Sequence, residues 1–380
     1  MSWTDYITDR LNRRKQAGLL RSLEALEPHS PVHVTRNGQK LTLFSSNDYL
    51  GLSGDQRVID GAIDTIERHG LGARGSPLIC GYTTLHEELE QKIADWKGTE
   101  AALLCPTGFA ANLSVISGLT DEETTVFSDA LNHASIIDGC ALAKRRGANV
   151  EIVPHRDVDA LQRKLAACTT PRTMVVTDSV FSMDGDLAPL RRLADVCNEH
   201  DALFVIDEAH GSFVFGQHGR GLAEQMGVTD RVDIHIGTLS KGAGGMGGFI
   251  ATTERMRSLL LNLGRSYIYS TAAPLSVIGG LLAAIDIVQT DPSPRRRLWT
   301  NVNRLADGLD VELTSPIVPI IIGDEDEAMA AAAQLRDRGI DVTAIRPPTV
   351  PEGTARLRVT VSAAHTDDDI DGLIEALREL

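Results

Sequence analysis

The chain has 380 residues and a formal net charge of −15. This acidic balance disfavours nucleic acid and anionic membranes as partners, because both carry negative charge themselves. Hydrophobic residues make up 42% and charged residues 23% of the sequence, as in ordinary soluble globular proteins, and the length allows more than one domain.

The five cysteines are scattered singly and include no CxxC pair, so they predict reduced thiols rather than disulfides or a zinc site. The N-terminus carries Asp5, Asp9 and Arg10 and lacks the apolar core of a signal peptide. The longest apolar stretch, around 275–288, contains Asp286 and is too short to span a bilayer. We therefore expect a cytoplasmic protein without a membrane segment.

The N-terminal residues predict one long amphipathic helix. Apolar residues recur at helical spacing from Trp3 to Leu26, and the helix should end before Pro28. The simplest interpretation of its basic residues, which include Arg21, is that they form a helix face exposed to solvent. The alternative is that one or two of them bind an anion. A short strand at 41–44, a polar turn at 45–52, a helix at about 55–69 and a glycine-rich turn at 70–76 should follow.

From residue 101 onward, predicted strands alternate with helices. The strands are expected at 101–104, 124–127, 149–153, 173–178, 203–207, 234–238 and 247–251. This order predicts an α/β fold whose mostly parallel sheet is covered on both faces.

A long helical region, broken near Pro292 and Pro294, should run to about residue 313. Strands at 317–322, 341–345 and 356–361, with helices at 325–338 and 366–378, predict a smaller C-terminal α/β domain. We expect an N-terminal helix with short strands over 1–45, a large domain over 46–285 and the small domain over 286–380.

Candidate site residues follow the predicted strands at the edge where such sheets bind ligands. They are Gly108, His133, Ser179, Asp207 with His210, and Lys241. Each has a plain structural explanation, such as a helix cap for Asp207 or a core imidazole for His133. Their recurrence at equivalent positions nevertheless predicts a site, and Gly108 at a helix N-terminus is suited to phosphate.

Lys241 lies in a glycine-rich loop, where a lysine could bind phosphate, form a Schiff base or remain solvated. The surrounding GxGxxG match is not a dinucleotide fingerprint, because a strand follows it instead of a helix. The DEAH sequence at 207–210 is not a helicase box, because the chain has no phosphate-binding P-loop. Asp207, His210 and Lys241 together suggest pyridoxal phosphate, whose aldehyde needs an amine and whose pyridine nitrogen needs a carboxylate.

Several motifs give the chain a specific resemblance over essentially its full length. It resembles the α-oxoamine synthases, which have the PLP-dependent transferase fold type I of aspartate aminotransferase. The motifs lie at 1–3, 46–52, 107–112, 133–135, 180–186, 207–211, 238–242 and 346–351. One departure is Ala243, where related lysine motifs usually carry a bulkier residue, so the packing of the lysine loop is in question.

The resemblance implies a role for each matching residue. Lys241 would bind the cofactor covalently and later remove the α-proton of the amino acid, while Asp207 would pair with the pyridine nitrogen. His210 would contact the ring hydroxyl and His133 would stack on the ring. The remaining implied contacts to the cofactor are Gly108, Phe109, Ser179, Thr238 and, from a neighbouring subunit, Ser270 and Thr271. The implied contacts to substrate are Arg21, Asn47, His133, Thr349 and Arg358. Among these, Arg358 would bind the carboxylate of the amino acid.

The resemblance also implies a reaction and partners. The closest branch condenses L-alanine with pimeloyl-CoA or pimeloyl-acyl carrier protein, releasing carbon dioxide, as a homodimer with shared active sites. Glycine C-acetyltransferase and 5-aminolevulinate synthase use the same machinery and remain alternatives, since they differ in amino acid and acyl group. A plain aminotransferase and a catalytically silent scaffold subunit are further alternatives, although Lys241, Asp207 and His133 argue against the second.

Overall fold

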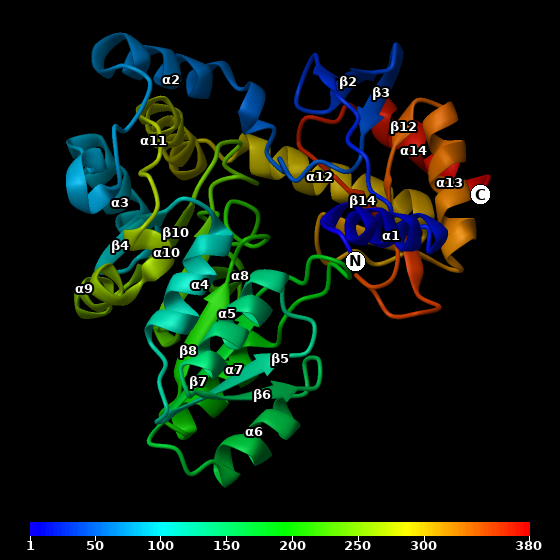
Figure 1. The fold of residues 1–380 in the computed structure, drawn as a ribbon. Coiled ribbons are helices and arrows are strands. Elements are labelled where there is room, and N and C mark those ends of the chain that lie inside the picture. The colour runs from blue at the N-terminus through cyan, green and yellow to red at the C-terminus, as the bar shows by residue number, and fades with distance from the viewer.

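The computed structural model describes residues 1–380, and a seven-stranded sheet forms the centre of its larger part (Figure 1). Its order is β4-β10-β9-β8-β7-β5-β6. The strands are β4 (Ala101–Cys105), β5 (Thr124–Asp129), β6 (Asn149–Val153), β7 (Arg172–Asp178), β8 (Leu203–Asp207), β9 (Ile234–Thr238) and β10 (Gly248–Thr252). Strands β5 to β9 pair in parallel, whereas β10 runs antiparallel to both β9 and β4. The predicted α/β fold with a mostly parallel sheet is confirmed.

Both faces of this sheet are covered by helices, as expected. Successive strand side chains point to opposite faces, so Phe249 belongs to one buried cluster and Ile250 to the other. Helices α4 (Gly108–Gly118), α5 (Ala134–Arg145) and α9 (Glu254–Leu263) pack on the Ile250 side. The Phe249 side is covered by α3 (Thr84–Lys97), α6 (Val158–Ala167), α7 (Leu190–Glu199) and α11 (Leu275–Thr290).

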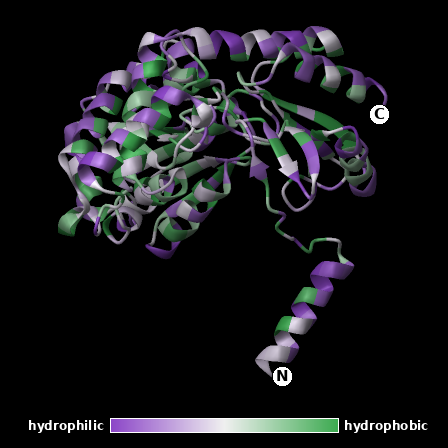
Figure 2. Ribbon diagram, turned by 90° about the horizontal axis from the view of Figure 1, so that it is seen from above, coloured by the Kyte–Doolittle hydropathy of each residue, from purple (hydrophilic) through white to green (hydrophobic).

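The N-terminal helix is shorter than predicted. Helix α1 spans Trp3–Gln16 and has no buried residue. Gly18 adopts a left-handed φ of +64°, and the amide of Leu19 donates to the Arg14 carbonyl at 2.7 Å, which closes the helix end. The prediction of a helix to residue 26 was wrong, because the apolar residues beyond Gly18 lie in an irregular segment. Figure 2 shows α1 projecting from the body of the molecule on this segment.

The first strands pair with the C-terminal part of the chain. Strands β1 (Glu27–Pro28), β2 (His33–Arg36), β3 (Gln39–Leu43) and β12 (Ile340–Asp341) form one sheet, in which β3 and β12 are parallel. Arg36 reinforces the pairing, since its guanidinium donates to both Asp341 carboxylate oxygens at 2.7 and 3.2 Å. The predicted strand at 341–345 is divided between β12 and β13 (Thr343–Ile345). The domain divisions stay a prediction.

The C-terminal elements otherwise follow their predicted positions. Strands β11 (Ile317–Gly323), β14 (Ala355–Thr360) and β13 form an antiparallel sheet with helices α13 (Glu325–Asp337) and α14 (Asp367–Arg378). Helix α11 meets α12 (Ser293–Leu309) at an angle of 71°.

No single helix of the chain has the length and apolar character needed to cross a membrane. Helices α11 and α12 reach that length and composition only when they are taken together. The remaining helices are α2 (Gln56–His69), α8 (Leu222–Gln225) and α10 (Arg265–Ile268), with single turns at Leu52–Gly54, Pro77–Gly81 and Thr229–Arg231.

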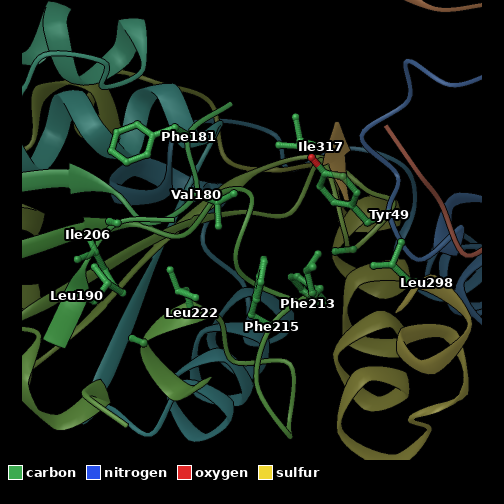
Figure 3. Close-up of a cluster of buried hydrophobic side chains, with 14 of the residues drawn as sticks. Tyr49, Val180, Phe181, Leu190, Ile206, Phe213, Phe215, Leu222, Leu298 and Ile317 are labelled. Carbon is green, nitrogen blue, oxygen red and sulfur yellow. The ribbon is translucent and has the colours of Figure 1, made fainter. Parts of the chain in front are cut away.

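The larger hydrophobic cluster continues from the central sheet into the C-terminal part. Figure 3 shows Ile206 of β8, Phe181 of the segment after β7, Tyr49, Leu298 of α12 and Ile317 of β11 within this cluster. All are nearly or completely inaccessible to solvent. The segments that carry polar site residues, around Tyr49 and Phe181, are therefore anchored in a common core.

The five cysteines are free thiols, as predicted.

Candidate active site

A cavity of about 230 Å³ lies at the carboxyl ends of the central strands. Asp178, Asp207 and Thr238 enter it directly from the ends of β7, β8 and β9. Its full lining is Thr107, Gly108, Phe109, Asn112, His133, Ser135, Asp178, Ser182, Asp207, Ala209, His210, Thr238, Ser240 and Lys241. Of the sequence-predicted residues, Lys241, Asp207, His210, His133, Gly108, Phe109 and Thr238 are brought together here.

Lys241 is placed by the loop between the antiparallel strands β9 and β10. The loop is closed by hydrogen bonds from the Leu239 amide to the Gly247 carbonyl and from the Gly245 amide to the Leu239 carbonyl, both 3.0 Å. Ala243 is completely buried, so the small side chain at this position is part of the packed core. Burial lowers the pKa of Lys241 to about 8, although the charges of Asp207 and Asp178 act in the opposite direction. The amine is therefore easier to deprotonate than an ordinary lysine.

Asp207 is a buried carboxylate with two directed hydrogen bonds. Its Oδ2 accepts from the side-chain amide of Asn112 on α4 at 2.6 Å, and its Oδ1 accepts from the backbone amide of Ala209 at 2.7 Å. The same Asn112 nitrogen donates to Ser135 at 2.9 Å. These donors stabilise a negative charge at the cavity wall and orient the carboxylate.

His210 connects the lysine to a buried tyrosine. Its Nε2 lies 2.8 Å from Lys241 Nζ and its Nδ1 lies 2.6 Å from the hydroxyl of Tyr49. Burial, followed by the positive charges of Lys241 and Arg358, holds the pKa of His210 well below its usual value. Burial likewise raises the pKa of Tyr49 to about 12. A neutral imidazole thus lies between a protonated phenol and the lysine amine.

His133 caps helix α5 and presents its ring at the cavity. Its backbone amide donates to Asp178 at 2.9 Å, and its Nδ1 accepts from the Ser135 amide at 3.2 Å. Phe109 meets the ring edge to face, with 6.4 Å between ring centroids. Burial lowers the pKa of His133 and, with the nearby charge of Asp207, raises the pKa of Asp178 well above its usual range.

The N-terminus of helix α4 opens onto the other side of the cavity. Thr107 caps the helix by accepting from the Ala110 amide at 3.0 Å, which leaves the first amides, at Gly108 and Phe109, directed outward. A Cβ at Gly108 would lie 3.3 Å from Thr238 Cβ, so the helix end and β9 are in close contact. The hydroxyls of Thr238 and Ser240 lie 2.7 Å apart beside it. Such an arrangement suits an anionic phosphate.

Other predicted residues lie away from the cavity lining. Ser179 is completely buried and donates to Glu208 at 3.1 Å. The guanidinium of Arg358 lies 3.4 and 3.5 Å from the Asn47 side-chain oxygen, so these two predicted substrate residues are neighbours. Arg21 and Thr349 are exposed. Ser270 and Thr271 line a separate small cavity with Tyr82 and Tyr267.

Sequence reasoning assigned no role to several residues of the cavity lining, nor to Tyr49 beside His210. Asn112, Ser135 and Ser182 lie within motifs that carried the family resemblance, and Tyr49 lies within another. Their types gave no chemical signal of their own, because a lone amide, hydroxyl or phenol is common in any loop. Asp178 was signalled only by its place at a strand end, the same signal that selected Ser179.

Comparison with known proteins establishes the family. A model of the aminotransferase class I and II family matches residues 39–377. The 8-amino-7-oxononanoate synthase of Anaeromyxobacter dehalogenans is 46% identical over 98% of this chain and 94% of that protein. The chain belongs to the class I and II aminotransferase family and to the 8-amino-7-oxononanoate synthase group within it. The resemblance stated from sequence is confirmed.

Solved structures agree with this assignment. A high-resolution structure of SPT (serine palmitoyltransferase) with PLP as an internal aldimine superposes with a TM-score of 0.93, at 31% identity and with 99% and 96% of the two chains covered. The 8-amino-7-oxononanoate synthase of Francisella tularensis gives a TM-score of 0.75 at 27% identity, with 89% and 97% covered. The fold type predicted from sequence is therefore confirmed.

The cavity has the groups that pyridoxal phosphate requires, and the family and its structures show this to be the cofactor. It offers an amine of lowered pKa at Lys241 for an aldehyde and a buried carboxylate at Asp207 for a pyridine nitrogen. The amides and hydroxyls at the start of α4 and at the end of β9 are available for a phosphate. The residues present fit the group.

Proposed function

We propose that the chain is an 8-amino-7-oxononanoate synthase of biotin biosynthesis. It would condense L-alanine with a pimeloyl thioester and release 8-amino-7-oxononanoate, carbon dioxide and the free thiol carrier, either coenzyme A or acyl carrier protein. The observation that carries this proposal is the gathering of Lys241, Asp207, His210 and His133 around one cavity. The full-length similarity to a named synthase selects this reaction among those that such a cavity supports.

We assign a task in this reaction to the main cavity residues. When bound, the cofactor supplies a conjugated ring that accepts the electrons released at the α-carbon. Lys241 would hold the cofactor through its aldehyde and would serve as the base for the α-proton of the amino acid, since its pKa of about 8 suits a base near neutral pH. Asp207 would keep the pyridine nitrogen of the cofactor protonated, and Asn112 holds that carboxylate in place. His210 would donate toward the ring hydroxyl of the cofactor, and His133 would stack on the ring. Gly108, Phe109 and Thr238 would help to hold the cofactor and its phosphate. Ser179, which is buried and donates to Glu208, would contribute only from behind the cavity lining.

The amino-acid carboxylate is assigned to Arg358, with Asn47 and His133 beside it. Arg358 is buried, and its guanidinium is oriented by the Ser182 carbonyl at 2.5 Å and the Asn47 side chain. A guanidinium in such a place gives a charge-assisted, directional bond to a carboxylate. Thr349 and Arg21 are proposed to contact the acyl substrate.

We further propose a cytoplasmic homodimer with shared active sites. Ser270 and Thr271 line a cavity separate from that of Lys241, which supports their predicted role at the site of a partner subunit. Analytical ultracentrifugation would test the dimer. Mixing Lys241→Ala subunits with Thr271→Ala subunits would test the sharing, because hybrid dimers should regain one intact site.

The decisive experiment for function is thiol release by the purified protein reconstituted with pyridoxal phosphate. Release that requires both L-alanine and pimeloyl-CoA, with the nine-carbon amino ketone confirmed by mass spectrometry, is expected. Lys241→Ala serves as the control and should release none. Glycine with a short acyl thioester as the preferred pair would replace the proposal with a sibling enzyme. Preference for L-serine and palmitoyl-CoA would replace it with the activity named for the structural neighbours of high TM-score.

A further inference from the structure

A short hairpin after β7 joins the two parts of the molecule. We refer to residues 180–187 as the 180–187 hairpin. Val180 and Leu187 form an isolated antiparallel bridge, and the Phe181 amide donates to the Asp186 carbonyl at 3.0 Å. The Gly185 amide returns to the Phe181 carbonyl at 2.8 Å. These bonds hold the two strands of the hairpin together, so a displacement of one strand also displaces the other.

The tip of the hairpin holds the arginines of strand β14. Arg358 Nε donates to the Ser182 carbonyl at 2.5 Å, and Arg356 forms an ion pair with Asp184. A Cβ at Gly185 would lie 2.1 Å from the Ile317 carbonyl oxygen, so the hairpin is in direct contact with β11 as well. The Ser182 carbonyl thus orients the Arg358 guanidinium, and displacement of the hairpin would displace that guanidinium.

The opposite side of the hairpin is attached to the central sheet through His155. This residue follows β6, and its Nδ1 lies 2.9 Å from Asp129 Oδ1 at the end of β5. Its Nε2 lies 2.9 Å from Asp186 Oδ2 in the hairpin. Phe181 packs edge-on against the imidazole, with 4.4 Å between ring centroids. The histidine is therefore a bridge between a strand end and the hairpin.

The bridge requires both ring nitrogens to carry protons, because each faces a carboxylate that can only accept. Burial disfavours the imidazolium, but hydrogen bonds and charges from Asp129 and Asp186 prevail and raise the pKa of His155. Arg156 strengthens the same contact, since its backbone amide donates to Asp129 and its guanidinium to Asp186, both at 2.8 Å. Neither His155 nor these carboxylates line the cofactor cavity.

We propose that His155 is a positioning residue for the amino-acid substrate, which ties the 180–187 hairpin to the central sheet and thereby holds Arg358 in the orientation that binds the substrate carboxylate. This inference rests on the proposed function, in which Arg358 binds that carboxylate. It assigns no contact between His155 and substrate or cofactor. The expected consequence is a loss of amino-acid affinity when the tie is weakened, with cofactor binding preserved.

The test compares His155→Gln with the wild-type holoenzyme. The dissociation constant of L-alanine is measured from the change in cofactor absorption, and hydrogen exchange of 180–187 is followed by mass spectrometry. We expect alanine affinity to fall roughly tenfold, hairpin exchange to accelerate, and the KM for pimeloyl-CoA to stay unchanged. His218→Gln is the matched control, because the His218 side chain also pairs with a carboxylate, Glu224, at 2.5 Å, but that carboxylate lies outside the 180–187 hairpin. It should change none of these quantities.

Two further variants keep the inference falsifiable. Asp186→Asn weakens the same tie with little change of volume and should reproduce the alanine defect, which decides the matter if His155→Gln does not fold. When His155→Gln is added to Arg358→Lys, alanine affinity should fall little further. The guanidinium through which His155 is proposed to act is already absent from that variant. Unchanged alanine affinity, unchanged exchange at 180–187, or fully additive effects would each overturn the inference.

The outcomes also separate this inference from the proposed function. If the wild-type protein binds alanine but releases no thiol from pimeloyl-CoA, the proposed reaction fails, while the alanine dissociation constants still test His155. If no amino acid changes the cofactor absorption, Arg358 has no carboxylate to bind and the inference about His155 fails as well.

Discussion

Arg21 is exposed in the irregular segment that follows α1. This segment is held to the C-terminal part by Arg346, whose guanidinium donates to the Gly18 carbonyl. If Arg21 binds the distal carboxylate of the pimeloyl chain, Arg21→Ala should lower kcat/KM for pimeloyl-CoA roughly tenfold, the cost of one charge-assisted hydrogen bond. The same constant for heptanoyl-CoA, which lacks that carboxylate, should not change.

Arg14→Ala is the control for this prediction, because Arg14 is another exposed cation on the neighbouring helix. Equal discrimination between the two thioesters in wild type and Arg21→Ala would show that Arg21 is part of a solvated face, the simpler reading of these basic residues.

Asn112 lies in the cavity lining and donates a hydrogen bond to Asp207. Asn112→Ala removes a 2.6 Å hydrogen bond to a buried carboxylate, an interaction of about 1.5–3 kcal/mol when one partner is charged. The ionised form of Asp207 becomes less stable, so we expect the dissociation constant of pyridoxal phosphate to rise roughly tenfold in an absorption titration.

Asn301→Ala provides the comparison, since Asn301 is equally buried but donates to the Ser362 and His365 carbonyls, away from the cavity. It should lower the thermal midpoint and leave cofactor affinity unchanged. Similar cofactor affinities in both variants would mean that Asn112 supports only the fold.

At the scale of elements, the lysine loop depends on close contact with the turn at Leu52–Gly54. Gly244 has a φ of +67°, and a Cβ there would lie 2.2 Å from the Ser53 amide nitrogen. Gly227 has the same φ of +67° with no atom within 4 Å of such a Cβ. Gly227→Ala should therefore cost about 1–2 kcal/mol from the left-handed backbone alone. Gly244→Ala should cost more and lower kcat, because the loop that carries Lys241 must shift.

Urea unfolding and steady-state kinetics of the two variants measure this difference. Equal losses of stability, with kcat preserved in Gly244→Ala, would show that the loop moves away from Ser53 without disturbing Lys241.

At the scale of the whole molecule, His365 joins the N-terminal strands to the C-terminal part. Its ring stacks on Phe44 at 4.1 Å between centroids, its Nε2 lies 2.9 Å from the Leu43 carbonyl, and its Nδ1 accepts from the Ser362 amide at 3.0 Å. Burial lowers the pKa of His365 to about 4. The unfolded chain, with a histidine pKa near about 6.5, binds a proton that the folded chain excludes.

The stability that His365 contributes is therefore complete above about pH 6.5 and is lost as pH falls toward 4. The shift corresponds to about 3 kcal/mol. Urea unfolding at pH 7, 5.5 and 4.5 should show a shallower decline for His365→Gln than for the wild type. Parallel declines would assign the acid sensitivity to other buried groups, such as His235, whose pKa burial lowers to about 3.

Elements with a strong local pattern were predictable from sequence. The buried strands of the central sheet are short apolar runs followed by a polar residue, and each lies where it was expected. The N-terminal helix was overextended because the apolar spacing beyond Gln16 imitates a helix, whereas Gly18 ends it. The pairing of β3 with β12 was not predictable, since it joins residues about 300 positions apart that carry no signal for each other.

The sequence by itself determined the chemistry: a lysine in a glycine-rich loop, an aspartate and a histidine at strand ends, and the motifs that indicate pyridoxal phosphate. These signals are local, because strand ends and loops place their own side chains at one edge of a parallel sheet. Only the tertiary structure decided which groups adjust that chemistry. Asn112 meets Asp207 across 95 positions and Tyr49 meets His210 across 161, and the low pKa of Lys241 arises from burial by the assembled core. Burial and long-range contacts are properties of the packed chain, so no local pattern encodes them.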